Sequence, residues 1–79
     1  MEIYRDKLLF PNLEAELSRA NLSKPALAQI IGIAQGSMYS KLNGKTEFNL
    51  GEMQAIANCL ETMTEQKLTL DYLFSKGGN

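Results

Sequence analysis

The chain has 79 residues, of which 44% are hydrophobic and 22% are charged, and its formal net charge is −1. This composition is typical of one soluble globular domain and excludes an intrinsically disordered chain. The longest early apolar run, Leu8 to Phe10, is too short for a signal peptide or a membrane span, so we expect a cytoplasmic protein without a membrane partner.

Few residues of the chain are suited to catalysis or metal binding. There is one cysteine, Cys59, and no histidine, so we predict no disulfide, no metal and no cofactor. Cys59 lies three residues after Ile56 and next to Leu60, which predicts a small buried hydrophobic residue and not a reactive thiol. Glu14 and Glu16 are two residues apart and do not face each other, so we interpret both as solvated helix surface and predict no enzyme activity.

The charges are unevenly distributed along the chain. Residues 17–46 contain four bases and no acid, which gives this segment a charge of +4, whereas the rest of the chain carries −5. The four bases are Arg19, Lys24, Lys41 and Lys45. A negative total argues against nucleic-acid binding, but this distribution predicts a cationic surface on an anionic body.

The first predicted helix runs from about Pro11 to Ala20, because apolar residues recur there at spacings of three and four. These residues are Leu9, Leu13, Leu17 and Ala20. Pro11 suits the first turn, and Asn21 can adopt the left-handed conformation that ends a helix. Residues 1–7 remain unassigned, since they could extend this helix or cross its surface.

The next two helices are short and closely spaced. Ser23 is a good N-cap for a helix of about two turns, and Gly32 can supply the positive φ angle that ends it. A third helix is predicted from near Gln35 to the stop signal Asn43-Gly44, where either residue can be left-handed. Steps of 100° per residue divide this helix into two sides. Met38 and Leu42 fall on one side, and Gly36, Tyr39, Ser40 and Asn43 share the opposite arc.

The sequence pattern in the last third of the chain predicts one long and one very short helix. Asn49 and Glu52 have the spacing of a capping box. The helix that follows is expected to bury Leu50, Met53, Ile56, Ala57 and Leu60. Residues 61–67 indicate a polar connection, although the helix could continue into them. Thr69 then caps a final turn that would close the core with Leu70, Leu73 and Phe74, and the last five residues, SKGGN, indicate a frayed tail.

Together these elements predict an all-α domain, a bundle of about five short helices with its core at about residues 12–74. Residues 23–43 form a helix-turn-helix unit that presents its second helix away from the body. The sequence LSKPALAQIIGIAQGSMYSKLNGK, followed by EFNLGEMQAIANCL and LTLDYLF, resembles the lambda-repressor-like DNA-binding domain of Xre/Cro-type phage and prophage regulators. The resemblance covers residues from about Asn12 to Phe74.

The resemblance implies roles for individual residues at matching positions. The implied base contacts are Gln35, Gly36, Ser37 and Ser40, with Tyr39 as a further candidate. The implied phosphate contacts are Ser23, Lys24, Asn43 and Lys45, and the lysine chemistry adds Lys41 to them. Three positions depart from the family pattern: Ala34 replaces a capping residue, Gly36 replaces a longer side chain, and Lys41 replaces an apolar residue.

We therefore predict a regulator of the phage or prophage type, most plausibly a repressor, that binds double-stranded DNA with residues 35–43 in the major groove. One small module usually binds weakly, so the resemblance implies a homodimer on a pseudo-palindromic site. No small-molecule ligand is predicted. The alternative is a helical protein-interaction module, such as an antitoxin or an adaptor, on the same fold.

Overall fold

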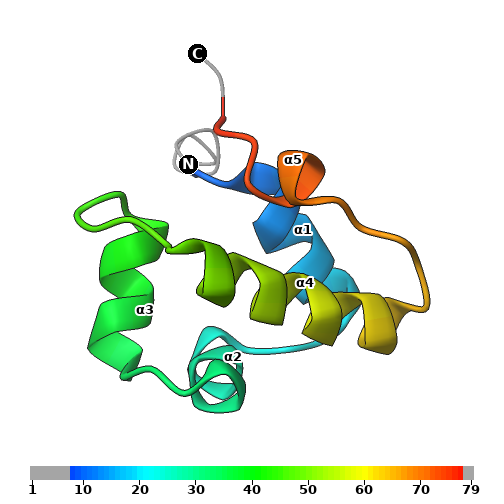
Figure 1. Ribbon diagram of the computed structural model, residues 1–79, viewed down its shortest axis with the longest axis horizontal. Coiled ribbons are helices and arrows are strands. Elements are labelled where there is room, and N and C mark those ends of the chain that lie inside the picture. Colours follow the sequence, from blue (N-terminus) through cyan, green and yellow to red (C-terminus); the bar gives the residue numbers. More distant parts are fainter. Residues whose placement is uncertain (1–7, 78–79) are drawn as a thin grey trace, which may run out of the picture.

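The structure, a computed structural model, describes residues 8–77 of the chain. This part of the chain contains five helices and no strand, which confirms the all-α prediction. In chain order the helices are α1 (Pro11–Arg19), α2 (Lys24–Ile31), α3 (Gln35–Leu42), α4 (Leu50–Thr64) and α5 (Leu70–Leu73) (Figure 1). None of them is long and apolar enough to cross a membrane. The unassigned residues 1–7 lie outside the described part of the chain.

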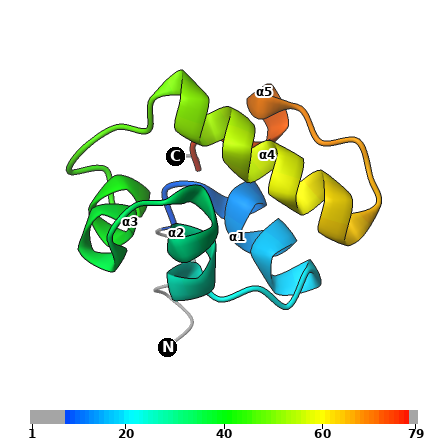
Figure 2. The same ribbon diagram turned by 60° about the horizontal axis from the view of Figure 1, so that its bottom comes forward.

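Four of the helices form the body of the molecule, and α3 lies at its edge. Helix α1 packs against α4 and α5, and α4 also packs against α2 and α5. Helix α3 packs mainly against α2 and lies at the left side of the molecule in both views (Figures 1 and 2). Helix α3, which was predicted to contact DNA, is therefore the least enclosed of the four longer helices.

One apolar core connects all five helices. Its buried hydrophobic residues are Phe10, Leu13, Leu17, Leu27, Ala28, Met38, Leu42, Phe48, Ile56, Ala57, Leu60, Leu68 and Leu73. At one corner Phe10, Phe48 and Phe74 pack edge to face, with ring centroids 5.3 to 5.8 Å apart. This aromatic corner joins the segment before α1, the loop before α4 and the end of α5.

The helix starts follow the capping signals in the sequence. The Ser23 Oγ accepts a hydrogen bond from the Ala26 N–H at 3.2 Å at the start of α2. At the start of α4 the Asn49 Oδ1 accepts from the Glu52 N–H at 2.7 Å, and the Glu52 Oε1 accepts from the Asn49 N–H at 3.0 Å. These bonds satisfy N–H groups that a helix start leaves free, and the predicted capping box is confirmed.

Left-handed residues mark the helix ends. Asn21 has φ 56° after α1 and Gly32 has φ 82° after α2, as predicted. In the Asn43-Gly44 pair it is Gly44 that is left-handed, with φ 88°. Helix α4 continues through Thr64, so the helical alternative for residues 61–64 is correct, and Glu65 with φ 56° ends it.

The expectations for Leu50 and for the C-terminal tail are wrong. Leu50 is exposed and not buried, because it is the first residue of α4 and projects beyond the side that Ile56 and Leu60 turn to the core. The tail is not frayed at residues 75–77, because the Gly77 N–H donates to the Leu9 carbonyl at 2.8 Å. That bond holds the segment after α5 against the segment before α1. The last two residues of the predicted tail lie outside the described part of the chain.

Cys59 is half-buried on α4, so the prediction of a buried residue is only partly correct. Its Sγ lies 3.8 Å from the Sδ of Met63, one turn further along the helix. Burial raises the pKa of the Cys59 thiol above its ordinary value. The thiol therefore stays protonated near neutral pH, which lowers its nucleophilicity.

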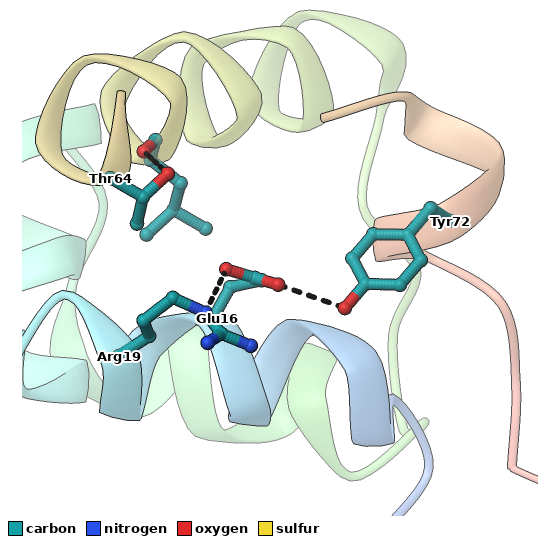
Figure 3. Close-up of polar contacts among 5 residues, drawn as sticks. Glu16, Arg19, Thr64 and Tyr72 are labelled. Atoms are coloured by element: carbon teal, nitrogen blue, oxygen red, sulfur yellow. Dashed lines mark hydrogen bonds and ion pairs between the residues drawn. The ribbon is translucent and has the colours of Figure 1, made fainter. Parts of the chain in front are cut away.

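Glu16 also contradicts the sequence prediction, because it is buried with only 2% of its surface exposed. It lies three residues after Leu13, on the side of α1 that α5 covers. The Tyr72 hydroxyl donates to the Glu16 Oε2 at 2.8 Å, and the Arg19 Nε donates to the Oε1 at 3.0 Å (Figure 3). The Asn12 amide donates to the Tyr72 carbonyl at 2.9 Å. This polar network ties α5 to α1 and satisfies the buried carboxylate.

The Tyr72 hydroxyl should contribute to stability in a pH-dependent way. Tyr72→Phe removes one partner of the buried Glu16 carboxylate, so the free energy of unfolding should fall by about 1–2 kcal/mol near neutral pH. Urea denaturation measures this difference. Tyr39→Phe is the matched control, because Tyr39 is exposed and lies outside the network.

The sign of the pH dependence follows from the same contact. The hydrogen bond to Glu16, then burial and the charge of Glu16, raise the pKa of Tyr72 above its ordinary value of 10.0, although the charge of Arg19 opposes this. The stabilisation is therefore fully present below about pH 10 and is lost as the pH rises through the pKa of Tyr72 in the folded protein. A difference between wild type and Tyr72→Phe that persists unchanged above that pKa would contradict this assignment.

Candidate nucleic-acid interface

The turn between α2 and α3 is built from a small buried residue and a left-handed glycine. Ala28 is buried where α2 meets the core, and its carbonyl accepts from the Gly32 N–H at 2.9 Å and from the Ile33 N–H at 3.0 Å. These two bonds end α2 and redirect the chain. Helix α3 then starts at Gln35, as predicted.

Helix α3 has one buried side and one open side. Met38 and Leu42 are buried in the core. Of the predicted base contacts, Gly36, Ser37 and Tyr39 are exposed and Ser40 is half-buried, whereas Gln35 is exposed because it is the first residue of α3, although its position is offset by only about 60° from that of Met38. Tyr39 is the aromatic residue among these predicted contacts. Its surface is 41% exposed, so much of the residue is available to a ligand.

The turn after α3 folds back onto the last turn of the helix. The Ser40 carbonyl accepts from the Lys45 N–H at 2.9 Å and from the Thr46 N–H at 3.4 Å. This explains why Ser40 is less open than Tyr39. Asn43 and Lys45, two of the predicted phosphate contacts, are exposed on this turn.

The fold brings part of the predicted site together. Lys24, Tyr39 and Asn43 line one hollow of about 150 Å³ between α1, α2 and α3. A predicted base contact thus lies beside two predicted phosphate contacts, one from the start of α2 and one from the turn after α3. Ser23 is exposed at the start of α2, where its Oγ already accepts from the Ala26 N–H. Its hydroxyl hydrogen is still free to be donated to an anion.

The two helix starts at the interface differ in their capping. Ser23 caps α2, whereas Ala34 gives α3 no side-chain acceptor. The first N–H groups of α3 therefore keep their capacity to donate to a ligand. Such groups carry a partial positive charge and suit anions or base acceptors.

The cationic surface predicted for residues 17–46 is largely neutralised by acids from outside that segment. Arg19 Nε lies 3.0 Å from Glu16 Oε1, and Lys24 Nζ lies 3.1 Å from Glu14 Oε1. Lys41 forms the third pair, with Glu52 on α4. Lys45 is exposed and has no such pair among residues 8–77. The prediction is wrong in this respect, because charge along the chain does not reveal the acids that folding brings alongside.

The three pairs differ in how easily a competing anion could replace the acid. The side chains of Arg19 and Lys24 are 55% and 35% exposed. The Lys24–Glu14 pair is partly exposed and contributes at most about 1 kcal/mol, so its exchange for another anion costs little. Arg19 is held more firmly, because its partner Glu16 is buried and would lose a hydrogen-bond donor. Lys41 is different, because its side chain is only 15% exposed and its Nζ also donates to the Glu47 carbonyl at 3.2 Å. The structure thus holds Lys41 against Glu52 at the start of α4 and against the loop that precedes it.

Sequence reasoning missed the partners of these bases. Glu14 and Glu52 contact two of the predicted site residues. Nothing in their spacing from Lys24 or Lys41 pointed to this, because the partners belong to different helices.

A comparison with protein families finds a match to residues 12–66. The matching model is described as the Cro/C1-type HTH DNA-binding domain. The matched residues extend from the start of α1 to just beyond α4, so they include α2, α3 and the turn between them. Comparisons with curated proteins and with solved structures gave no match.

Two glycines of this unit should respond oppositely to the same substitution. A Cβ at Gly36 or at Gly32 would meet nothing within 4 Å, but Gly32 has φ +82° whereas Gly36 lies within α3. Gly36→Ala should raise the free energy of unfolding by about 0.5–1 kcal/mol, because alanine favours a helix. Gly32→Ala should lower it by about 1–2 kcal/mol, because alanine is strained in the left-handed region.

Thermal or urea denaturation of both variants measures this contrast. A loss of stability in Gly36→Ala would show that Gly36 packs against another part of the molecule. The open side of α3 would then be incorrectly assigned.

Proposed function

Because the chain belongs to the Cro/C1-type helix-turn-helix DNA-binding domain family, we propose that it is a sequence-specific regulator of transcription that places α3 in the major groove of duplex DNA. The observation that carries this proposal is the open side of α3. Gly36, Ser37 and Tyr39 are exposed, Gln35 is exposed at the start of the helix, and Met38 and Leu42 anchor the buried side. In this proposal residues 23–43 are the DNA-reading unit of a single domain with its core at residues 12–74.

The dimensions and side chains of α3 suit this role. Its eight residues make a helix about 12 Å long, and the major groove, about 12 Å wide, admits a helix. Gln35 can bond an adenine bidentately at N6 and N7, and the hydroxyls of Ser37 and Ser40 can donate or accept at several base edges. Gly36, which has no side chain, lets the helix backbone approach the bases closely.

The proposed phosphate contacts flank α3 on two sides. Ser23 and Lys24 come from the start of α2, and Asn43 and Lys45 come from the turn after α3. Their donors suit phosphate oxygens, which fix the position of a protein on DNA without reading its sequence. The partly exposed pair between Lys24 and Glu14 can open for a phosphate at small cost.

We further propose that the protein is a repressor of the phage or prophage type and acts in the cytoplasm at the nucleoid. The resemblance of the helix-turn-helix sequence to such regulators supports this. A single module of this size usually binds weakly, so two copies on a pseudo-palindromic site are the expected binding unit.

One observation favours a second candidate, a helical protein-interaction module of the antitoxin or adaptor kind. Three of the four bases in residues 17–46 are paired with acids, which reduces the attraction of this surface to phosphates. Under this alternative the open side of α3 contacts a protein, and duplex DNA binds weakly or without salt dependence.

Selection of bound sequences from a random duplex pool tests the proposed function directly. We expect enrichment of two related half-sites whose centres are about one helical turn apart, or a multiple of that spacing, because two copies would bind the same face of the duplex. Enrichment of a single half-site that binds one protein with full affinity would contradict the dimer. A pool without enrichment, even at about 50 mM salt, would favour the protein-interaction module.

The division of roles between Gln35 and Lys45 gives a second test. Gln35→Ala should cost about 1–3 kcal/mol of binding free energy on the selected site and relax the preference at one base pair. Lys45→Ala should weaken all duplexes alike, and it should reduce the slope of log affinity against log salt by about 0.9 for the phosphate it no longer neutralises. Affinities from fluorescence anisotropy at several salt concentrations give both quantities. Equal, sequence-independent losses in both variants would remove Gln35 from the base-reading role.

A further inference from the structure

Lys41 is held by two contacts on the α4 side of α3. Its Nζ lies 3.3 Å from the Glu52 Oε1 and donates to the Glu47 carbonyl at 3.2 Å. Its position on α3 is offset by about 60° from that of Met38, so it borders the buried side of the helix. A lysine engaged in this way has little freedom to reach a phosphate.

We propose that Lys41 is a positioning residue, which sets the rotation of α3 about its own axis through Glu52 and does not contact DNA. This inference rests on the proposed function, because the rotation of α3 matters only if its open side reads a ligand. It also gives Lys41 a role different from the phosphate contact that the sequence predicted.

The rigidity of Glu52 makes this contact suitable for positioning. The Glu52 Oε1 that faces Lys41 also accepts from the Asn49 N–H at 3.0 Å, and the Glu52 N–H donates to the Asn49 Oδ1 at 2.7 Å. The capping box therefore restricts the Glu52 side chain to one orientation. Lys41 thus connects α3 to a fixed point at the start of α4.

The second contact of Lys41 fixes the loop between α3 and α4. The Glu47 carbonyl that accepts from Lys41 lies near the end of this loop, and the Lys45 N–H donates to the Ser40 carbonyl near its beginning. The loop is therefore held at both ends. Because Asn43 and Lys45 belong to this turn, Lys41 also fixes the relation between proposed phosphate and base contacts.

A small rotation of α3 would be sufficient to disturb base reading. Met38 and Leu42 set how deeply the helix packs, but they form only one line of contact along it. A rotation of about 20° moves side chains about 5 Å from the helix axis by about 2 Å. Productive contacts tolerate about 0.5 Å of displacement. A second anchor away from the Met38 and Leu42 line restricts this rotation.

The experiment compares two matched pairs of variants on the duplex selected above. Lys41→Met keeps most of the aliphatic stem and removes the charge, and Lys45→Met makes the same change at an exposed lysine. Lys41→Met should lower the affinity roughly two- to thirtyfold without changing the salt slope. Lys45→Met should reduce that slope by about 0.9. A matching reduction of the slope in Lys41→Met would overturn the proposal, because it would identify a phosphate contact.

Substitution of Glu52, the acid partner of Lys41, gives a second test. A positioning role and a phosphate-contact role of Lys41 predict opposite changes in DNA affinity for this substitution. Glu52→Gln keeps the capping box, because glutamine can also accept from the Asn49 N–H, but it weakens the attraction to Lys41. Glu47→Gln removes the same charge from the neighbouring loop, where the backbone carbonyl and not the side chain contacts Lys41. If Lys41 positions α3, Glu52→Gln lowers the affinity relative to Glu47→Gln. If Lys41 binds phosphate, Glu52→Gln frees it and raises the affinity, which overturns the proposal.

Two further measurements distinguish a failure of the positioning role from a loss of folding and from a failure of the proposed function. Lys41→Arg keeps the charge and donors and should retain near wild-type affinity, so it carries the test together with Glu52→Gln if Lys41→Met fails to fold. Urea denaturation without DNA should show that the effects of Lys41→Met and Glu52→Gln are not additive. Additive effects overturn the proposal even when wild type binds DNA, whereas wild type that binds no duplex at low salt overturns the proposed function itself.

Discussion

The fold must hold an eight-residue helix in place while leaving one side of it uncovered. Helix α3 contributes only Met38 and Leu42 to the buried core. Apolar burial of this extent is too small to define an orientation as well as a position, because apolar contacts have no preferred direction. The surrounding structure supplies the missing direction with polar bonds: the Ala28 carbonyl closes the turn before α3, and Lys41 reaches α4 on its other flank.

Much of the helical architecture could be predicted because its signals are local. Ser23, Gly32 and the pair of Asn49 and Glu52 each act within a few residues of their own position, and their effects are as expected. The same reasoning failed for Leu50. It lies at the first position of α4, where an apolar residue can project past the core although its spacing suggests burial.

The electrostatics could not be predicted in the same way, because they depend on residues that only the tertiary fold brings together. Lys24 meets Glu14 across two helices, and Lys41 meets Glu52 across a loop. Glu16 is a partial exception. Its spacing of three from Leu13 placed it near the apolar side of α1, so burial could have been inferred, but the Tyr72 hydroxyl that satisfies it lies 56 residues away. Of the candidate site, the open side of α3 was therefore predictable, and the neutralisation of its flanking bases was not.

The aromatic corner has a consequence for how the chain assembles. Phe10, Phe48 and Phe74 come from near the beginning, middle and end of the described chain, and their rings meet only after two long stretches have closed into loops. Loop closure costs conformational entropy before the packing of the rings can offset that cost. Helices α2 and α3, by contrast, are neighbours in sequence and meet through a short turn. Contacts of low sequence separation thus build the helix pair, whereas the phenylalanine cluster makes the folded state cooperative by requiring distant segments to converge.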